Sequence, residues 1–362
     1  MYAADILRSF MLLPGPSGYE NEVAFALREA FSGFCEQVTT DQAGNVMACF
    51  PGQDPDVPVV MVYAHMDQLG FIVRFIEPDG YLRLERLGGI PEKVLPGLRI
   101  RIRTAQGTWV TGLIGSKSHH ATPAEEKYTA DPIDSLFVDI GAASAEQVSA
   151  KGIRIGSPAV YEPACSELAQ GRICGTAVDN RGGLTALVLL AEQLKKEPPP
   201  GTVWLVGTVS EEFNLRGAML AARAIRPAAA IALDVVLSGD TPDLRGRYAT
   251  AVGQGPAVML YNFHGRGTLN GTIPHAGLVE RAEQAADQAG IKLQRFAGIG
   301  ILTDSAYVQL EGVGIAAMEL GFPARYTHTP SEVCDPEDIE QLACLLGRLL
   351  RNLDSTFDNH RY

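Results

Sequence analysis

The second half of the chain alternates between helical and strand-like hydrophobic patterns, and this alternation restricts the fold more than any other feature. Residues 182–197 have the apolar spacing of a helix, and residues 202–209 form the continuous apolar run of a buried strand. The alternation continues to a final helix from about Asp335 to Leu353. An earlier apolar run, at 57–65, adds a further strand. Such alternation predicts an α/β fold: a mostly parallel sheet flanked by helices.

The segment from 70 to 165 has a different character. It contains short alternating segments, such as FIVRFI at 71–76 and LRIRIRT at 98–104, and no long helical pattern. Asp79-Gly80 marks a hairpin turn between two of these segments. We therefore predict a small β-barrel domain at 70–165, inserted into a larger discontinuous domain formed by residues 1–69 and 166–362.

A helix is also expected shortly after the start of the chain. Ser17 and Glu20 have the spacing of a capping box, in which each side chain bonds a backbone N–H of the other residue. Val23, Leu27 and Phe31 then follow at helical intervals. The pattern predicts a helix that begins at this point.

Composition excludes several kinds of partner. Forty-two acidic residues against thirty basic ones give a net charge of −12, which would repel a phosphate backbone, so nucleic acid is not expected as a partner. No apolar run is long enough to predict a membrane span, and the first residues do not have the pattern of a signal peptide. The six cysteines are scattered without a CxxC pair. They are expected to be reduced thiols in a cytoplasmic protein.

Polar residues gather where the predicted strands end. Ligands of open α/β sheets bind beyond the carboxyl ends of the strands, so residues at these positions are candidates for a functional site. All but one of the candidates follow a predicted strand, and the exception, Asp179, precedes a helix. The candidates are His65, Asp67, Asp179, Glu211, Glu212, Asp234 and His328.

This mixture of imidazole and carboxylate groups is typical of a metal site. It suits Zn²⁺, Co²⁺ or Mn²⁺ better than Ca²⁺ or an iron–sulfur cluster. A single catalytic ion needs only three protein ligands, and the larger number of candidates favours two ions that share a bridge. Between two such ions a bridging water becomes a hydroxide near neutral pH, which provides a nucleophile for hydrolysis.

Two spacings suggest roles beside the ligands. Asp67 lies two residues after His65, where its carboxylate would fix the tautomer of a ligating imidazole. If Glu212 is a ligand, its neighbour Glu211 would lie beside the water and act as the general base. The pair could instead be idle surface carboxylates at the start of a loop, and the joint occurrence of the other candidates argues against that alternative.

Motifs of rival chemistries are absent from the sequence. It contains no GxSxG nucleophile elbow, no HExxH zinc motif and no GxxxxGK[ST] phosphate loop. The stretch GRGTLNG at 265–271 does not have the glycine spacing of a dinucleotide fingerprint. A glycosidase would use a carboxylate pair and leave the histidines without a part.

The candidate residues lie in motifs that resemble those of a known family, the M42 metallo-aminopeptidases. The similarity covers nearly the whole chain, and its motifs occur in the family's order. These motifs are AHMDQLG (64–70), GTAVDNRGG (175–183), VSEEFNLRGA (209–218), ALDV (232–235), GQGPAV (253–258), TDSAY (303–307) and RYTHTPSEV (325–333). One departure is Asn180, which stands next to Asp179 where the family often has a second aspartate.

The resemblance implies a particular set of roles. It implies that Asp179 bridges two divalent ions. Zn²⁺ is the expected ion, and Co²⁺ and Mn²⁺ are alternatives. His65 and Asp234 would complete one ion's ligands, and Glu212 and His328 the other's. Glu211 would be the general base and Asp67 the residue that orients His65.

The resemblance also implies what surrounds the site. The larger domain would be the catalytic metallopeptidase domain, and the inserted barrel would mediate dimerisation. The protein would form homo-oligomers, such as a dodecamer, and remove N-terminal residues from short peptides that have a free N-terminus. Its first-residue preference does not follow from the sequence.

Two other functions remain open at the level of sequence. One is a metal-dependent deacylase of N-acyl amino acids or small amides, and the other is a non-catalytic oligomeric metal-binding protein. His119 and His120, in the predicted barrel, are typical of surface histidines. An alternative hypothesis is that one of them reaches the active site of a neighbouring subunit and stabilises the oxyanion.

Overall fold

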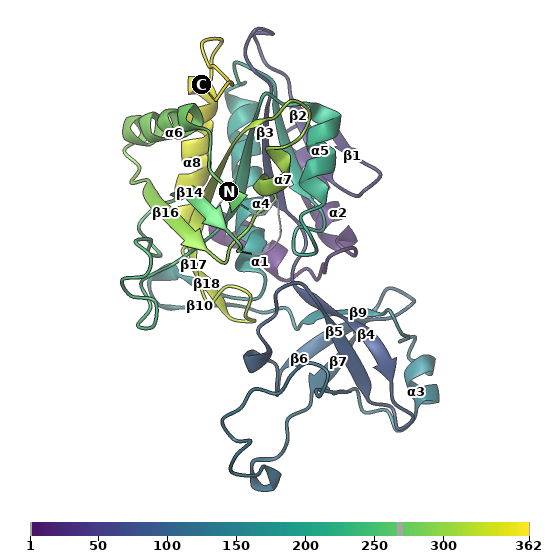
Figure 1. The fold of residues 1–362 in the computed structure, drawn as a ribbon. Coiled ribbons are helices and arrows are strands. Elements are labelled where there is room, and N and C mark those ends of the chain that lie inside the picture. The colour runs from purple at the N-terminus through teal and green to yellow at the C-terminus, as the bar shows by residue number, and fades with distance from the viewer. Residues whose placement is uncertain (1, 266–270, 362) are drawn as a thin grey trace.

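The computed structural model describes residues 2–265 and 271–361, so most of the GRGTLNG stretch lies outside the described residues. An α/β body with a twelve-stranded sheet lies next to a separate closed barrel (Figure 1). Both chain termini belong to the α/β body, and the barrel is inserted between β3 and β10.

The centre of the large sheet is parallel. Its four central strands, in spatial order, are β12 (Val203–Thr208), β3 (Val60–His65), β13 (Ala229–Leu237) and β17 (Ala316–Arg325). Antiparallel strands extend both edges: β2 (Val46–Phe50) and β1 (Gln37–Thr40) on one, and β18 (Glu332–Cys334), β11 (Ile173–Gly175) and β10 (Cys165–Glu167) on the other. A branch from β17 consists of β14 (Ala257–Phe263), β15 (Gly271–Thr272) and β16 (Gln294–Ile299).

Helices cover both faces of this sheet. One face packs against α1 (Ala3–Met11), α2 (Asn21–Ser32), α4 (Val178–Lys196), α6 (Ala276–Ala289) and α8 (Pro336–Asn352), which form the largest hydrophobic core. The other face packs against α5 (Gly217–Ile225) and α7 (Ser305–Val308). The central strands are buried on both sides, which explains why their sequences are continuously apolar.

The inserted unit is a closed antiparallel barrel with a hydrophobic core of its own. Its strands are β4 (Gly70–Ile76), β5 (Leu82–Leu87), β6 (Arg99–Arg103), β7 (Trp109–Ile114), β8 (Val138–Asp139) and β9 (Pro158–Tyr161). The short helix α3 (Ala145–Ala150) and two 3₁₀ turns, Glu92–Val94 and His119–Ala121, lie in its connections. In Figure 1 the barrel lies below the α/β body and projects away from it.

The structure confirms the predicted fold class, a helix-flanked α/β sheet with an inserted barrel. The sheet is mixed, because only its centre and the β14–β16 pair are parallel. The prediction of a capping box is wrong. Glu20 is the N-cap of α2 without a side-chain cap bond; Ser17 bonds Asp67 instead, and Glu20 bonds Ser210. All six cysteines are free. Among the described residues, no helix is sufficiently long and apolar to span a membrane.

Candidate functional site

The carboxyl edge of the parallel strands brings the predicted residues to one place. His65 is the last residue of β3 and pairs with Thr208, the last residue of β12. After β12, Ser210 adopts a left-handed conformation (φ 55°), and this turn directs Glu211 and Glu212 back across the edge. Asp234 lies on the neighbouring strand β13.

Asp179 lies between two groups of potential ligands. Its Oδ1 is 3.1 Å from Nε2 of His65, and its Oδ2 is 3.6 Å from Nε2 of His328. One group that could hold a metal ion is His65, Asp179 and Asp234, and the other is Asp179, Glu212 and His328. Each carboxylate oxygen of Asp179 therefore faces a different histidine, which is the arrangement expected of a bridging ligand.

Backbone carbonyls hold both imidazoles in one tautomer. Nδ1 of His65 donates to the carbonyl oxygen of Asp67 (3.1 Å), and Nδ1 of His328 donates to that of Gly89 (2.9 Å). Because Nδ1 donates to a carbonyl in each ring, the neutral imidazole would direct the lone pair of Nε2 toward Asp179, where a cation could bind. Gly89 follows strand β5, so a residue of the inserted segment orients this ligand from the other domain.

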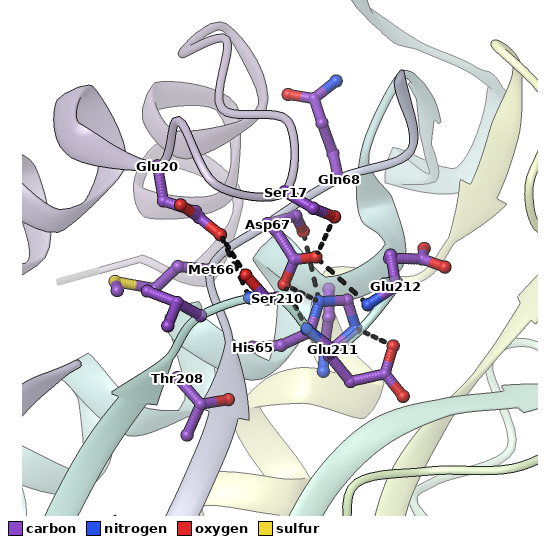
Figure 2. Close-up of polar contacts among 12 residues, drawn as sticks. Ser17, Glu20, His65, Met66, Asp67, Gln68, Thr208, Ser210, Glu211 and Glu212 are labelled. Carbon is purple, nitrogen blue, oxygen red and sulfur yellow. Dashed lines mark hydrogen bonds and ion pairs between the residues drawn. The ribbon is translucent and has the colours of Figure 1, made fainter. Parts of the chain in front are cut away.

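The carboxylate of Asp67 supports the loop that carries the two glutamates (Figure 2). Its Oδ1 accepts the backbone N–H of Glu211 (2.9 Å), and its Oδ2 accepts the N–H of Glu212 (3.1 Å) and the hydroxyl of Ser17 (2.6 Å). Its nearest approach to Nδ1 of His65 is longer, 3.5 Å. Asp67 thus contacts His65 mainly through its backbone, and its side chain positions Glu211 and Glu212.

Glu332, which is 2% exposed, belongs to the site but was not among the predicted residues. Its Oε2 accepts the backbone N–H of Asp179 (3.0 Å), and its Oε1 accepts that of His328 (2.6 Å). One buried carboxylate therefore joins the backbone of Asp179 to that of His328, two candidate ligands that are far apart in the sequence. Its position four residues after His328, in RYTHTPSEV, was the only signal in the sequence.

Two further buried side chains support the site from behind. Glu20 accepts the backbone N–H of Ser210 (3.0 Å) and so stabilises the left-handed turn before Glu211 (Figure 2). The guanidinium of Arg181 is fully buried and donates to the carbonyls of Met66 and Leu13. Burial lowers the pKa of Arg181 to about 10, although nearby acids oppose the shift.

Asn180, the departure from the family pattern, contributes no ligand. Its Nδ2 donates to the carbonyl of Leu233 (2.7 Å), and its Oδ1 accepts the N–H of Gly183 (2.9 Å). The amide is completely buried and engaged with the backbone. The amide of Asn180 can donate this hydrogen bond to the Leu233 carbonyl, whereas an ionised aspartate at this position has no donor.

The charges of the cluster explain why a cation fits there. Burial is the main cause of the raised pKa of Glu211 and Asp234, and it raises the pKa of Glu212 to about 7 and that of Glu332 to about 8. Burial alone would lower the pKa of His328, but Glu212 and Asp179 raise it to about 9. Buried carboxylates in this number require positive charge between them, so the donor set fits divalent cations.

The cluster opens into a cleft of about 760 Å³. Glu211 and Glu212 line it together with His65, Asp179, Asp234 and His328. Of the other predicted residues, Asp67 lies behind this wall, fully buried. His119 and His120 are exposed on a barrel connection and do not line the cleft of their own chain.

Histidines and carboxylates at the carboxyl edge of an α/β sheet, next to an open cleft, have the chemistry of a metal-dependent hydrolase site. The family model of M42 glutamyl aminopeptidase matches residues 44–345. The chain therefore belongs to this family and is an aminopeptidase, a hydrolase that acts on peptide bonds.

Relatives extend the match over the whole chain. Lysyl aminopeptidase of Pyrococcus furiosus is 31% identical over 96% of this chain and 97% of its own length. The structure of an aminopeptidase from the archaeon Desulfurococcus kamchatkensis superimposes with a TM-score of 0.91 at 31% identity, covering 98% of this chain and 95% of its own. TET1 peptidase of Pyrococcus horikoshii, which can assemble into a tetrahedron or a large octahedral shell, has a TM-score of 0.84 at 26% identity, with coverages of 96% and 98%.

Proposed function

We propose that the protein is a dinuclear metal-dependent aminopeptidase that acts on short peptides with a free N-terminus. The observation that carries the proposal is the position of Asp179, whose two carboxylate oxygens face Nε2 of His65 and Nε2 of His328. His65 and Asp234 would hold one ion with Asp179, and Glu212 and His328 would hold the other. Zn²⁺ suits these ligands best, and Co²⁺ and Mn²⁺ suit them as well.

The chemistry expected of bound ions is limited to two effects. They would lower the pKa of a water molecule and polarise the carbonyl of the scissile bond. The chain itself must supply the proton transfer, because expulsion of an amine requires a general acid. Glu211 is the best-placed residue, since its Oε2 lies 4.0 Å from Nε2 of His65 and its side chain lines the cleft.

Glu211 would act first as a base and then as an acid. It would take the proton of the attacking water and hand it to the nitrogen of the departing peptide. The bond from its backbone N–H to Asp67 keeps its main chain in place during this transfer. Glu211 donates no ligand to either of the two groups, which leaves its carboxylate free for the proton.

The test uses metal-stripped protein reloaded with Zn²⁺, Co²⁺ or Mn²⁺. Free and N-acetylated short peptides are incubated with the wild type and with Glu211→Gln, and the products are identified by mass spectrometry. We expect stepwise loss of first residues from the free peptides only, and a kcat of the variant lower by about 10² to 10⁴. The metal content of the variant is measured as well. If it equals that of the wild type, the lower kcat reflects loss of the general base and not loss of the metal site. Removal of acetyl groups, or a variant as active as the wild type, would refute the proposal.

A further inference from the structure

We propose that the cleft selects peptides whose first residue is neutral and apolar, such as leucine, isoleucine, valine or methionine. The inference rests on the proposed function and specifies its substrate. The first side chain of a peptide is attached to the same carbon as the free amine and the scissile carbonyl. Once that carbonyl lies at the cluster, the side chain must occupy the part of the cleft next to it.

Strand β13 forms one wall of this part of the cleft. Val235 directly follows Asp234, and Val235 and Leu237 are two positions apart, so both side chains project from the same face of the strand. Both line the cleft and are only partly buried. They therefore expose apolar surface in the cleft that the metal cluster also lines, and a substrate side chain can cover it.

The facing walls are apolar as well. Ile301 and Leu302 follow strand β16, and both are partly buried where they line the cleft. Leu215, in the loop after Glu212, and Tyr307, on α7, also line the cleft, and its uncharged polar lining residues are Asn214, Thr303 and Thr327. An apolar first side chain placed among these groups would lose its contact with water on several sides.

Outside the metal cluster, no described residue in the lining carries a carboxylate, an ammonium or a guanidinium group. Outside the metal cluster, the only ionisable groups that line the cleft among residues 2–265 and 271–361 are His264 and Tyr307. Two nearby acids do not line the cleft: Asp304 is buried and its Oδ2 accepts the hydroxyl of Thr208, and Asp240 pairs with Arg325. A lysyl side chain would lose hydration there without gaining a carboxylate outside the metal cluster, and a glutamyl side chain would find only the imidazole of His264 among the described lining residues.

The residues that line the cleft do not favour the charged first residues that the names of the family and of one relative mention. The family model is described as glutamyl aminopeptidase, and the relative from Pyrococcus furiosus is a lysyl aminopeptidase. Each of those first residues carries a charge that requires a partner of opposite sign. Outside the metal cluster, the described lining offers no carboxylate for a lysyl side chain and only the imidazole of His264 for a glutamyl one.

The test compares kcat/KM for leucyl, lysyl and glutamyl p-nitroanilides on the metal-loaded protein. We expect the leucyl substrate to be preferred by at least about tenfold, since burial of one such side chain is worth this much or more. Equal or faster hydrolysis of the lysyl or glutamyl substrate would overturn the inference while the proposed function stands. If the protein hydrolyses none of the three substrates and no free peptide, the proposed function itself is refuted.

Substitution of the apolar wall gives an independent test. Ile301→Glu is expected to reduce leucyl hydrolysis and to raise the lysyl-to-leucyl ratio by about tenfold or more, because the new carboxylate pairs with the lysyl ammonium. Ile301→Gln should reduce leucyl hydrolysis without the gain for lysyl. Ile299→Glu, at an exposed position that does not line the cleft, should leave the ratio unchanged. An unchanged ratio in Ile301→Glu, with normal metal content and melting temperature, would contradict the inference.

Discussion

Buried carboxylates that accept backbone N–H groups determine the geometry of the site at the scale of single residues. Asp67 holds the loop of Glu211 and Glu212, and Glu332 holds the backbone of Asp179 and His328. Each carboxylate uses both of its oxygens on different segments. Such groups orient ligands without coordinating a metal, and their loss weakens metal binding indirectly.

Glu332→Gln tests this role. The amide has one acceptor oxygen, so it can serve only one of the two N–H groups and must place its own donor against the other. We expect metal affinity to fall by about 10- to 100-fold, measured by competition with a chelator. Glu337→Gln, an exposed neighbour on α8, is the matched control and should bind metal like the wild type. Equal affinity in both variants would show that Glu332 does not position the ligands.

At the scale of elements, the start of α8 is tied to the turn before β14. Asp338, in the first turn of the helix, accepts the backbone N–H groups of Gly253 and Gly255, each at 2.7 Å. The carboxyl is buried, and burial raises its pKa from 3.8 to about 7 although the two bonds oppose the shift. The folded state therefore binds more protons than the unfolded state between about pH 4 and 7.

This shift predicts a pH dependence of stability. Because the folded pKa is raised, the stability that Asp338 contributes is present at low pH and declines as the pH rises through this window. Asp338→Asn does not titrate. The free energy of unfolding of the wild type minus that of the variant should fall by at least about 1.4 kcal/mol between pH 5 and pH 8, the equivalent of one pKa unit. Urea denaturation at several pH values measures it, and a difference that is constant or rises with pH would contradict the assignment.

His119 and His120 lie on a barrel connection, and their substitution tests whether a neighbouring subunit contributes to the active site. Both side chains are exposed and lie outside the cleft of their own chain. If one of them enters a neighbour's cleft, its replacement by alanine should reduce kcat by about tenfold or more and leave metal content unchanged. If both single variants turn over like the wild type, the two histidines have no catalytic part.

At the scale of the whole molecule, the barrel is a separate unit, and none of the candidate metal ligands named above lies in it. It has its own core and presents apolar side chains to solvent, among them Phe75, Leu113 and Ile155. We propose that the barrel mediates dimerisation and that dimers build larger homo-oligomers. The similar TET1 peptidase of Pyrococcus horikoshii can itself assemble into a tetrahedron or a large octahedral shell.

Light scattering on the intact protein tests the assembly. We expect a mass that is an even multiple of the 38.8 kDa chain. Phe75→Lys combined with Ile155→Lys should reduce the mass, because charges on a buried interface oppose association. A wild type that remains a monomer at micromolar concentration would exclude the assembly.

The sequence by itself determined the fold class and the placement of the candidate ligands at the strand ends. Continuous apolar runs can be satisfied only in strands covered on both faces, and parallel strands end at one edge, so His65, Glu212 and Asp234 had to be neighbours. The assigned ligand roles of these residues stay predictions. The domain boundaries and the cytoplasmic location also stay predictions.

Only the tertiary structure decided which groups hold those side chains in place. Glu332 and Asp179 are 153 residues apart, and Gly89 and His328 are 239 apart. No local pattern encodes such pairs, because a hydrogen bond between distant segments depends on how the chain packs and not on spacing. The same reason explains Ser17 and Glu20, whose spacing predicts a helix cap and whose side chains instead support the site. The apolar walls of the cleft likewise come from segments that meet only when the sheet forms.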